Sequence, residues 1–163
     1  MHSGDFNLQF ALMLATTESH KGHEYTGRLM HALARNYSSD LGAMLYWPWP
    51  VYWDFVRKIP YQDDPTLFLN PEREIVSRPK YMISGYFPAL DCKKKSILLA
   101  SHAWANRLPY KFLAGIENGG AEIHHVFPVV FDGRAWVNAD ATLPSNRYGE
   151  AKPFLTYAEE LAP

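Results

Sequence analysis

The sequence has almost no cysteine, no excess of either charge and no long apolar run. Its 163 residues include one cysteine, so no disulfide can form within the chain, which suits a reducing compartment such as the cytoplasm. Lysine and arginine total 16 against 17 acidic residues, a balance that argues against a nucleic-acid-binding domain. The N-terminal apolar stretch, Phe10 to Ala15, is too short to span a membrane and lacks the basic start of a signal peptide. We therefore expect neither a nucleic-acid nor a membrane partner.

The apolar and aromatic composition of the chain indicates one globular domain. Apolar residues make up 47% of the chain and aromatic residues 15%, which is typical of a folded protein with a sizeable core. We predict a single domain over residues 1–163, with a helical and aromatic-rich part at 1–77, a core at 78–144 and a tail at 145–163.

The first half of the chain predicts helices followed by irregular structure. Apolar residues recur at helical spacing from Leu8 to Ala15 and again from Tyr25 to Leu33. Residues 46–64 are rich in Trp, Tyr and Pro, which argues against a long helix and favours a packed irregular segment. This aromatic segment either packs the core or forms a carbohydrate or peptide platform. A short strand is expected at Thr66 to Leu69.

The second half predicts a helix and then three strands. Apolar residues at helical spacing place Cys92 at the start of a helix that Pro109 ends. The strand candidates that follow are 110–116, 123–131 and 134–139, and a short helix is expected at 156–161. A helix pair, a cysteine helix and an antiparallel meander make an α+β domain.

The last two strand candidates are joined by Asp132-Gly133, a signal for a tight hairpin turn. A two-residue turn sets Phe131 opposite Arg134 and therefore His125 opposite Asp140. Opposed side chains lie on one face with their Cβ atoms ~4.5–5.5 Å apart, so the carboxylate can orient the imidazole. His124 points to the other face. Pro128 implies an edge position or a bulge, and a bulge would shift the register and bring His124 into play.

Cys92 completes a group with known chemistry. The positive end of the helix dipole and the cations of Lys93–Lys95 favour its thiolate, and its backbone N–H is free to stabilise an oxyanion. A thiolate nucleophile at Cys92, a base at His125 and an orienting carboxylate at Asp140 make an acyl-transfer site. The alternative is that the lone cysteine is an inert core residue and the lysines form a solvated face.

These residues stand in motifs that resemble those of the transglutaminase-like superfamily. The nucleophile helix of that superfamily typically reads Gly-Asp-Cys, two acids, Lys, Ala and an apolar run, and the match here covers about residues 78–144. The matching passages are Asp91 to Ala100, Arg107 to Phe112, His125 to Phe127, Asp132-Gly133 and Trp136 to Thr142. Ser77-Arg78-Pro79 resembles phage- and prophage-encoded members. The chain departs from the pattern in its three lysines, at Leu90 in place of Gly and at Ala141 in place of Pro.

The resemblance implies a papain-like core, with the cysteine helix packed on an antiparallel sheet, and a cysteine peptidase or amidase without metal or cofactor. Its substrate would be a protein or peptide. Two alternatives stay open: a protein-glutamine cross-linking transglutaminase, and a virion assembly protein that keeps the fold. The protein would be cytoplasmic, or part of a virion if phage-encoded.

Two features of the sequence are left unassigned. The superfamily has a second oxyanion donor on an upstream side chain, for which Trp47, Trp49, Tyr81 and Tyr86 are all candidates. His20-Lys21-Gly22-His23 has the spacing of two metal ligands but no third one, and is typical of a solvated helix face.

Overall fold

The computed structural model describes residues 22–63, 76–117, 125–150 and 155–163, which form an α+β fold. In these ranges the helices are α2 (Gly22–Asn36), the 3₁₀ segment η1 (Ser38–Tyr46), α3 (Trp49–Lys58), α5 (Pro79–Ile83) and α6 (Cys92–Ala105). The strands are β1 (Tyr110–Glu117), β2 (His125–Phe131), β3 (Trp136–Asn138) and β4 (Leu155–Leu161).

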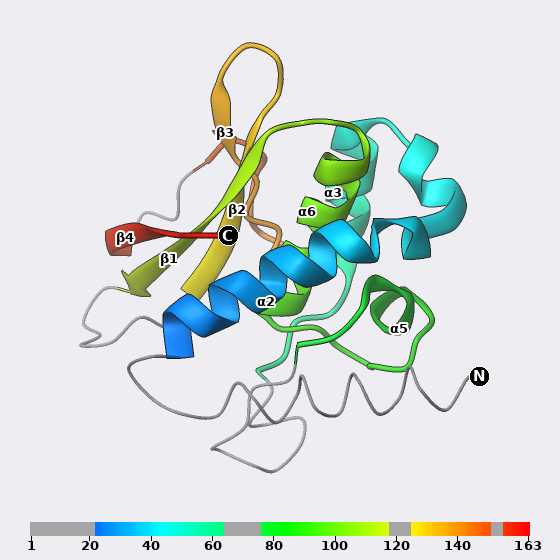
Figure 1. Cartoon of the computed structure of the whole chain (residues 1–163), viewed down its shortest axis with the longest axis horizontal. Coiled ribbons are helices and arrows are strands. Elements are labelled where there is room, and N and C mark those ends of the chain that lie inside the picture. Colours follow the sequence, from blue (N-terminus) through cyan, green and yellow to red (C-terminus); the bar gives the residue numbers. More distant parts are fainter. Residues whose placement is uncertain (1–21, 64–75, 118–124, 151–154) are drawn as a thin grey trace.

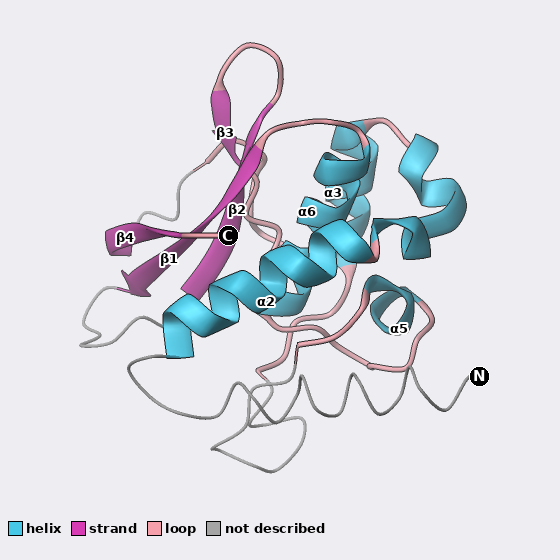
Figure 2. Cartoon of the chain, in the orientation of Figure 1, coloured by secondary structure: helices cyan, strands magenta, loops and turns pink. Residues whose placement is uncertain are grey.

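The four strands form one antiparallel sheet in the order β3-β2-β1-β4. The labelled helices lie to one side of this sheet, and α2 crosses in front of α6 (Figure 1). Helix α6 contacts β1 and β2 on one side and α2, α3, α5 and η1 around the rest of its surface. The two layers are separated clearly when the chain is coloured by secondary structure (Figure 2). The core therefore surrounds α6.

Helix α6 is buried on every side, which its sequence allows because apolar and small residues fill most of its length. Every residue from Lys94 to Ala103 is buried. Its first turn is capped by Asp91, whose Oδ1 accepts from the backbone N–H of Lys94 at 2.8 Å. None of the helices in the described ranges is long and apolar enough to cross a membrane.

The aromatic segment is helical, contrary to the sequence prediction. Residues 49–58 form α3, with Pro48 as the N-cap and Pro50 in the first turn. Proline is tolerated there because the first N–H groups of a helix have no acceptor within the helix. The prediction failed because it counted the prolines without their position. Tyr52, Trp53 and Val56 are buried in the core, so much of this segment serves packing.

The tail is a strand and not the expected short helix. Residues 155–161 form β4, which pairs with β1 at the edge of the sheet. Its end is fixed by α2: His31 Nε2 contacts Leu161 O at 3.1 Å, and a Cβ on Gly27 would come within 2.9 Å of Leu161. These contacts join distant parts of the chain, so local periodicity could not predict them. The helix expected at 8–15 and the strand expected at 66–69 lie outside the described residues.

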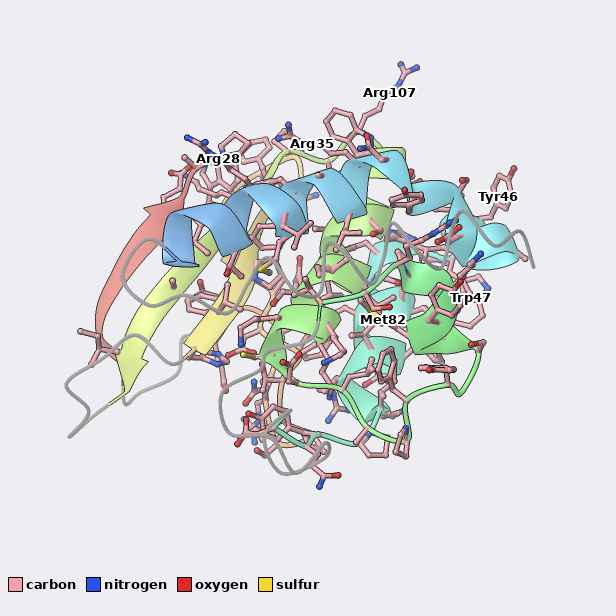
Figure 3. All side chains as sticks on the ribbon, turned by 60° about the horizontal axis from the view of Figure 1, so that its bottom comes forward. Arg28, Arg35, Tyr46, Trp47, Met82 and Arg107 are labelled. Atoms are coloured by element: carbon pink, nitrogen blue, oxygen red, sulfur yellow. The ribbon has the colours of Figure 1, made fainter. Side chains whose placement is uncertain are left out.

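Helix α6 ends in a tight backbone motif centred on Arg107. Arg107 has φ 57°, and the N–H groups of Arg107 and Leu108 donate to Trp104 O and Ala103 O at 3.1 and 2.9 Å. This pair of bonds is the Schellman ending, whose left-handed residue is usually glycine. The Arg107 side chain points away from the protein body (Figure 3).

We expect Arg107→Gly to raise the free energy of unfolding by about 0.5–1 kcal/mol. Glycine removes the cost of a left-handed Cβ, and its greater entropy in the unfolded chain offsets only part of that gain. Urea denaturation measures the difference. Arg107→Ala is the matched control: it removes the same side chain but keeps the strain, so it should not stabilise. Equal effects of the two variants would contradict the strain.

Candidate active site

The hairpin that joins β2 to β3 has a different register from the predicted one. Val129 faces Asn138 and Phe131 faces Trp136, so the loop contains four residues and not two. Asp132 closes this loop by accepting the N–H groups of Arg134 and Ala135 at 2.9 and 3.0 Å. The predicted pairing of His125 directly opposite Asp140 is therefore wrong. The shift is an even number of residues, however, so both side chains still lie on the same face of the sheet.

Pro128 lies on an interior strand and not at the expected edge or bulge. The pairing of β2 with β1 runs without a break from Tyr110 and Val130 to Gly115 and His125. The Pro128 carbonyl accepts the Ala139 N–H at 3.0 Å, at the point where β3 ends. Proline has no N–H to donate, but no residue of β3 lies opposite Pro128 to accept one. No bulge shifts the register, and His124 lies outside the described residues.

The structure brings His125 and Asp140 into direct contact. His125 Nε2 donates to Asp140 Oδ2 at 2.7 Å, and both side chains are buried. Asp140 is held in turn by the Thr142 N–H, which donates to its other oxygen at 3.0 Å. Because Nε2 bonds the carboxylate, Nδ1 is the ring nitrogen left to face a reactant. The Phe127 ring stacks on the imidazole at 5.5 Å between centroids and fixes its plane further.

Cys92 is placed beside His125 by the packing of α6 on β2. It is the first residue of the helix, and its thiol lies close enough to His125 to raise the pKa of the imidazole. Ser96 joins the two elements, since its hydroxyl contacts Cys92 O at 2.7 Å and Val126 O at 3.2 Å. The three residues singled out in the sequence thus form one connected group, and their catalytic role remains a prediction.

The electrostatics of the pair favour a charged state. Burial alone would lower the pKa of His125, but its hydrogen bond with Asp140 and its interaction with Cys92 outweigh that effect and raise the pKa to about 9. Burial alone would raise the pKa of Asp140, but hydrogen bonds from His125 and Thr142 lower it instead. The imidazolium and the carboxylate therefore stabilise each other within the core.

The lysines after the cysteine do not form a solvated face. Lys94 and Lys95 are both buried, and Lys93 is largely covered. Lys94 Nζ lies 3.6 Å from Asp91 Oδ1 and over the Phe87 ring. Lys95 Nζ turns to the other side and reaches the loop that carries Asp140. From the sequence, Lys95 was expected to act on the thiol and not on the Asp140 loop, and no role was assigned to Ser96, although both share the turn of helix that follows Cys92.

The four aromatic candidates for the second oxyanion donor fall into two groups, and each group has its own contacts. Trp47 and Trp49 both contact His102. His102 follows Cys92 by ten residues on α6, which places the two residues ~15 Å apart along the helix axis. Tyr81 and Tyr86 pack on each other, and Tyr86 continues to Phe87. None of these four is placed at the thiol by a contact in the described part of the chain.

Tyr61 is an aromatic residue near the thiol that the sequence analysis did not consider. The strand-like pairing of Tyr61 with Leu90 sets it beside the start of α6. Burial and its hydrogen bond to Asp63 raise the pKa of Tyr61, and negative charge on Cys92 raises it further. A Tyr-x-Asp sequence far from the cysteine gives no local signal of this proximity.

No group of three metal-ligating side chains occurs within the described ranges. The His20–His23 pair falls outside what the structure describes, because His20 is not placed and the His23 side chain is not described.

The raised pKa of His125 makes stability depend on pH. The folded protein holds the His125 proton up to about pH 9, whereas the unfolded chain releases it near 6.5. This stabilisation is complete below pH 6.5 and is lost as the pH rises. Burial lowers the pKa of Lys95 to about 8, so the contribution of Lys95 to stability increases with pH, but only above pH 8. We expect the free energy of unfolding to fall by up to about 2 kcal/mol between pH 6.5 and 8.

Urea denaturation at several pH values in that window measures the slope. His125→Asn should remove it, whereas His31→Asn, which changes another buried histidine far from Asp140, should keep it. A wild-type stability that is constant from pH 6.5 to 8 would contradict the charged pair.

A second prediction concerns the thiol. Iodoacetamide should modify Cys92 near neutral pH faster than it modifies free cysteine, because the thiol lies at a helix N-terminus beside the His125 imidazole, the group proposed to activate it. His125→Ala should slow the reaction, and His31→Ala should not. Mass spectrometry of the alkylated protein over time gives the rates. A wild-type rate no greater than that of free cysteine would leave Cys92 as core filling.

Comparisons of this chain with protein families, with curated proteins and with solved structures find no match. Interpretation of the site therefore depends on its own geometry. That geometry consists of a thiol at a helix N-terminus, an imidazole beside it and a buried carboxylate bonded to the ring nitrogen Nε2. Such an arrangement is able to perform nucleophilic acyl transfer.

Proposed function

We propose that this protein is a transglutaminase-like cysteine peptidase or amidase that hydrolyses an amide or peptide bond. The observation that carries the proposal is the buried His125, which bonds the Asp140 carboxylate at 2.7 Å and lies close enough to the Cys92 thiol for the two groups to interact. The α+β fold, with the cysteine helix packed on an antiparallel sheet, supports it. The proposed substrate is a protein or peptide, in keeping with the motif resemblance.

In the first half-reaction the Cys92 sulfur attacks the carbonyl carbon of the amide. The oxygen becomes an oxyanion, which the Cys92 N–H is placed to stabilise because the first residue of a helix has no acceptor for it within the helix. The proton on His125 Nδ1 passes to the amide nitrogen, the carbon–nitrogen bond breaks, and the amine leaves. A thioester on Cys92 remains.

In the second half-reaction water attacks the thioester and gives a proton to His125 Nδ1. The carbon–sulfur bond breaks, the acid product leaves, and the thiolate and imidazolium form again. Asp140 does not exchange a proton in this cycle; it holds the imidazole by Nε2 and stabilises its charge. Hydrolysis is favoured over cross-linking because water needs no second binding site.

We expect Cys92-dependent amide cleavage to exceed amine incorporation. The protein is incubated with a proteome-derived peptide mixture and a fluorescent primary amine, and mass spectrometry counts new termini and amine adducts in the same sample. Cys92→Ala should abolish both products. Asp140→Asn should lower kcat by roughly 10²–10⁴-fold, because the carboxylate no longer stabilises the imidazolium.

Each alternative has its own result in this assay. Amine adducts in excess of new termini would favour the cross-linking transglutaminase. Absence of both products, with Cys92→Ala still able to assemble into particles in the host, would favour the structural virion protein and reject hydrolysis.

A further inference from the structure

Lys95 is a buried lysine next to the group formed by Cys92, His125 and Asp140. Its side chain is 1% exposed, and its Nζ donates to Thr142 O at 2.9 Å, Ala141 O at 3.1 Å and Arg57 O at 3.3 Å. An ammonium group has three N–H donors, so these three carbonyls satisfy it completely. Two of them belong to the loop that directly follows Asp140.

One peptide group connects Lys95 to Asp140. The Ala141 carbonyl accepts from Lys95, and the N–H of the same peptide group, which belongs to Thr142, donates to Asp140 Oδ1 at 3.0 Å. Hydrogen bonds in a chain polarise each other, so a cation on the carbonyl strengthens the donation by the N–H. The chain of contacts therefore runs from Lys95 through this peptide group to Asp140 and then to His125.

The position of Lys95 is costly for folding alone. Removing an ammonium from water costs several kcal/mol, and within the described residues only neutral carbonyls, and no carboxylate, directly accept its protons. It also lies near the N-terminus of α6, where the helix dipole disfavours a cation. An apolar residue of the same volume would fill the space at lower cost.

We propose that Lys95 is a positioning residue, which holds the Asp140–Thr142 loop against α6 and keeps Asp140 ionised and aligned with His125. This inference rests on the proposed acyl-transfer function. Lys95 does not touch the thiol in this role; it acts through Asp140. Among the residues that the structure places, Arg57 on α3 is the other charged group that acts on Lys95; it opposes the charge of Lys95, whereas Asp140 favours it.

The alkaline side of the pH profile separates positioning from simple packing. Burial lowers the pKa of Lys95 to about 8, below the value of about 9 for His125. Hydrolysis should therefore decline above about pH 8, before His125 itself loses its proton. Lys95→Arg keeps a charge that does not titrate in this range, so the pH at which its hydrolysis rate declines should move upward toward pH 9. Lys95→Met should lower kcat by roughly 10–100-fold with little change in KM, because the residue is buried away from the substrate.

A second measurement does not need activity. The ¹³C-NMR titration of the Asp140 carboxyl should move to higher pH in Lys95→Met, since the variant removes both the cation and the polarised N–H. Lys94→Met is the matched control: it changes the neighbouring buried lysine, whose Nζ faces Asp91, and should leave the Asp140 titration and the alkaline decline in place. Circular dichroism establishes that each variant is folded.

The outcomes are distinguishable. An inactive wild-type protein would reject the proposed function, and the Asp140 titration would still decide the role of Lys95. An unchanged Asp140 titration in folded Lys95→Met would overturn positioning. So would an alkaline decline that stays near pH 8 in folded, active Lys95→Arg.

Discussion

The buried hydrogen bond between His125 and Asp140 is the interaction on which the other features of the site depend. Neither charge is stable in the core alone, because burial disfavours the ionised form of each, and only their contact raises the pKa of the imidazole and lowers that of the carboxyl. The contact requires a defined register between β2 and the segment after β3, because a shift of one residue turns one of the two side chains to the other face. The continuous pairing of β2 with β1 and the four-residue hairpin loop both meet that requirement.

Helix α6 brings Cys92 to this pair, and its sequence meets two opposed demands. From Ile97 to Ala100 it is apolar and packs in the core, whereas its first turns are polar although buried. Each polar group there has a specific partner: Asp91 caps the helix, Ser96 bonds Val126 of β2, and Lys95 bonds the loop after Asp140. The first turns of α6 therefore hold the helix in one position relative to β2 and to the loop that carries Asp140.

The sequence predicted the parts of this arrangement that depend on local pattern. Helix α6 and strand β1 follow from periodicity, and the shared face of His125 and Asp140 survived a wrong register because the error was even. Helix α3 was missed although its signal is local, because its prolines fall in the first turn, where a helix tolerates them. Two other features were beyond local pattern: β4 forms because β1 offers it a free edge, and Lys95 is buried because the Asp140 loop folds over it. Both depend on contacts between residues distant in the chain, as does the proximity of Tyr61 to Cys92.

The way the polar groups are buried bears on whether the site is chemical or structural. A chain that needed only a folded core would be at least as stable with apolar residues at Lys95, His125 and Asp140, because desolvated charges rarely repay their cost in folding energy. Here the buried charges are connected in sequence: Lys95 reaches Asp140 through one peptide group, Asp140 bonds His125, and His125 lies beside the chain's one thiol. A purely structural network has no need to end at a nucleophile or to raise the pKa of an imidazole next to it. Perturbed ionisable groups that converge on a nucleophile are the usual mark of a site built for proton transfer, and this is why we favour chemistry over assembly for Cys92.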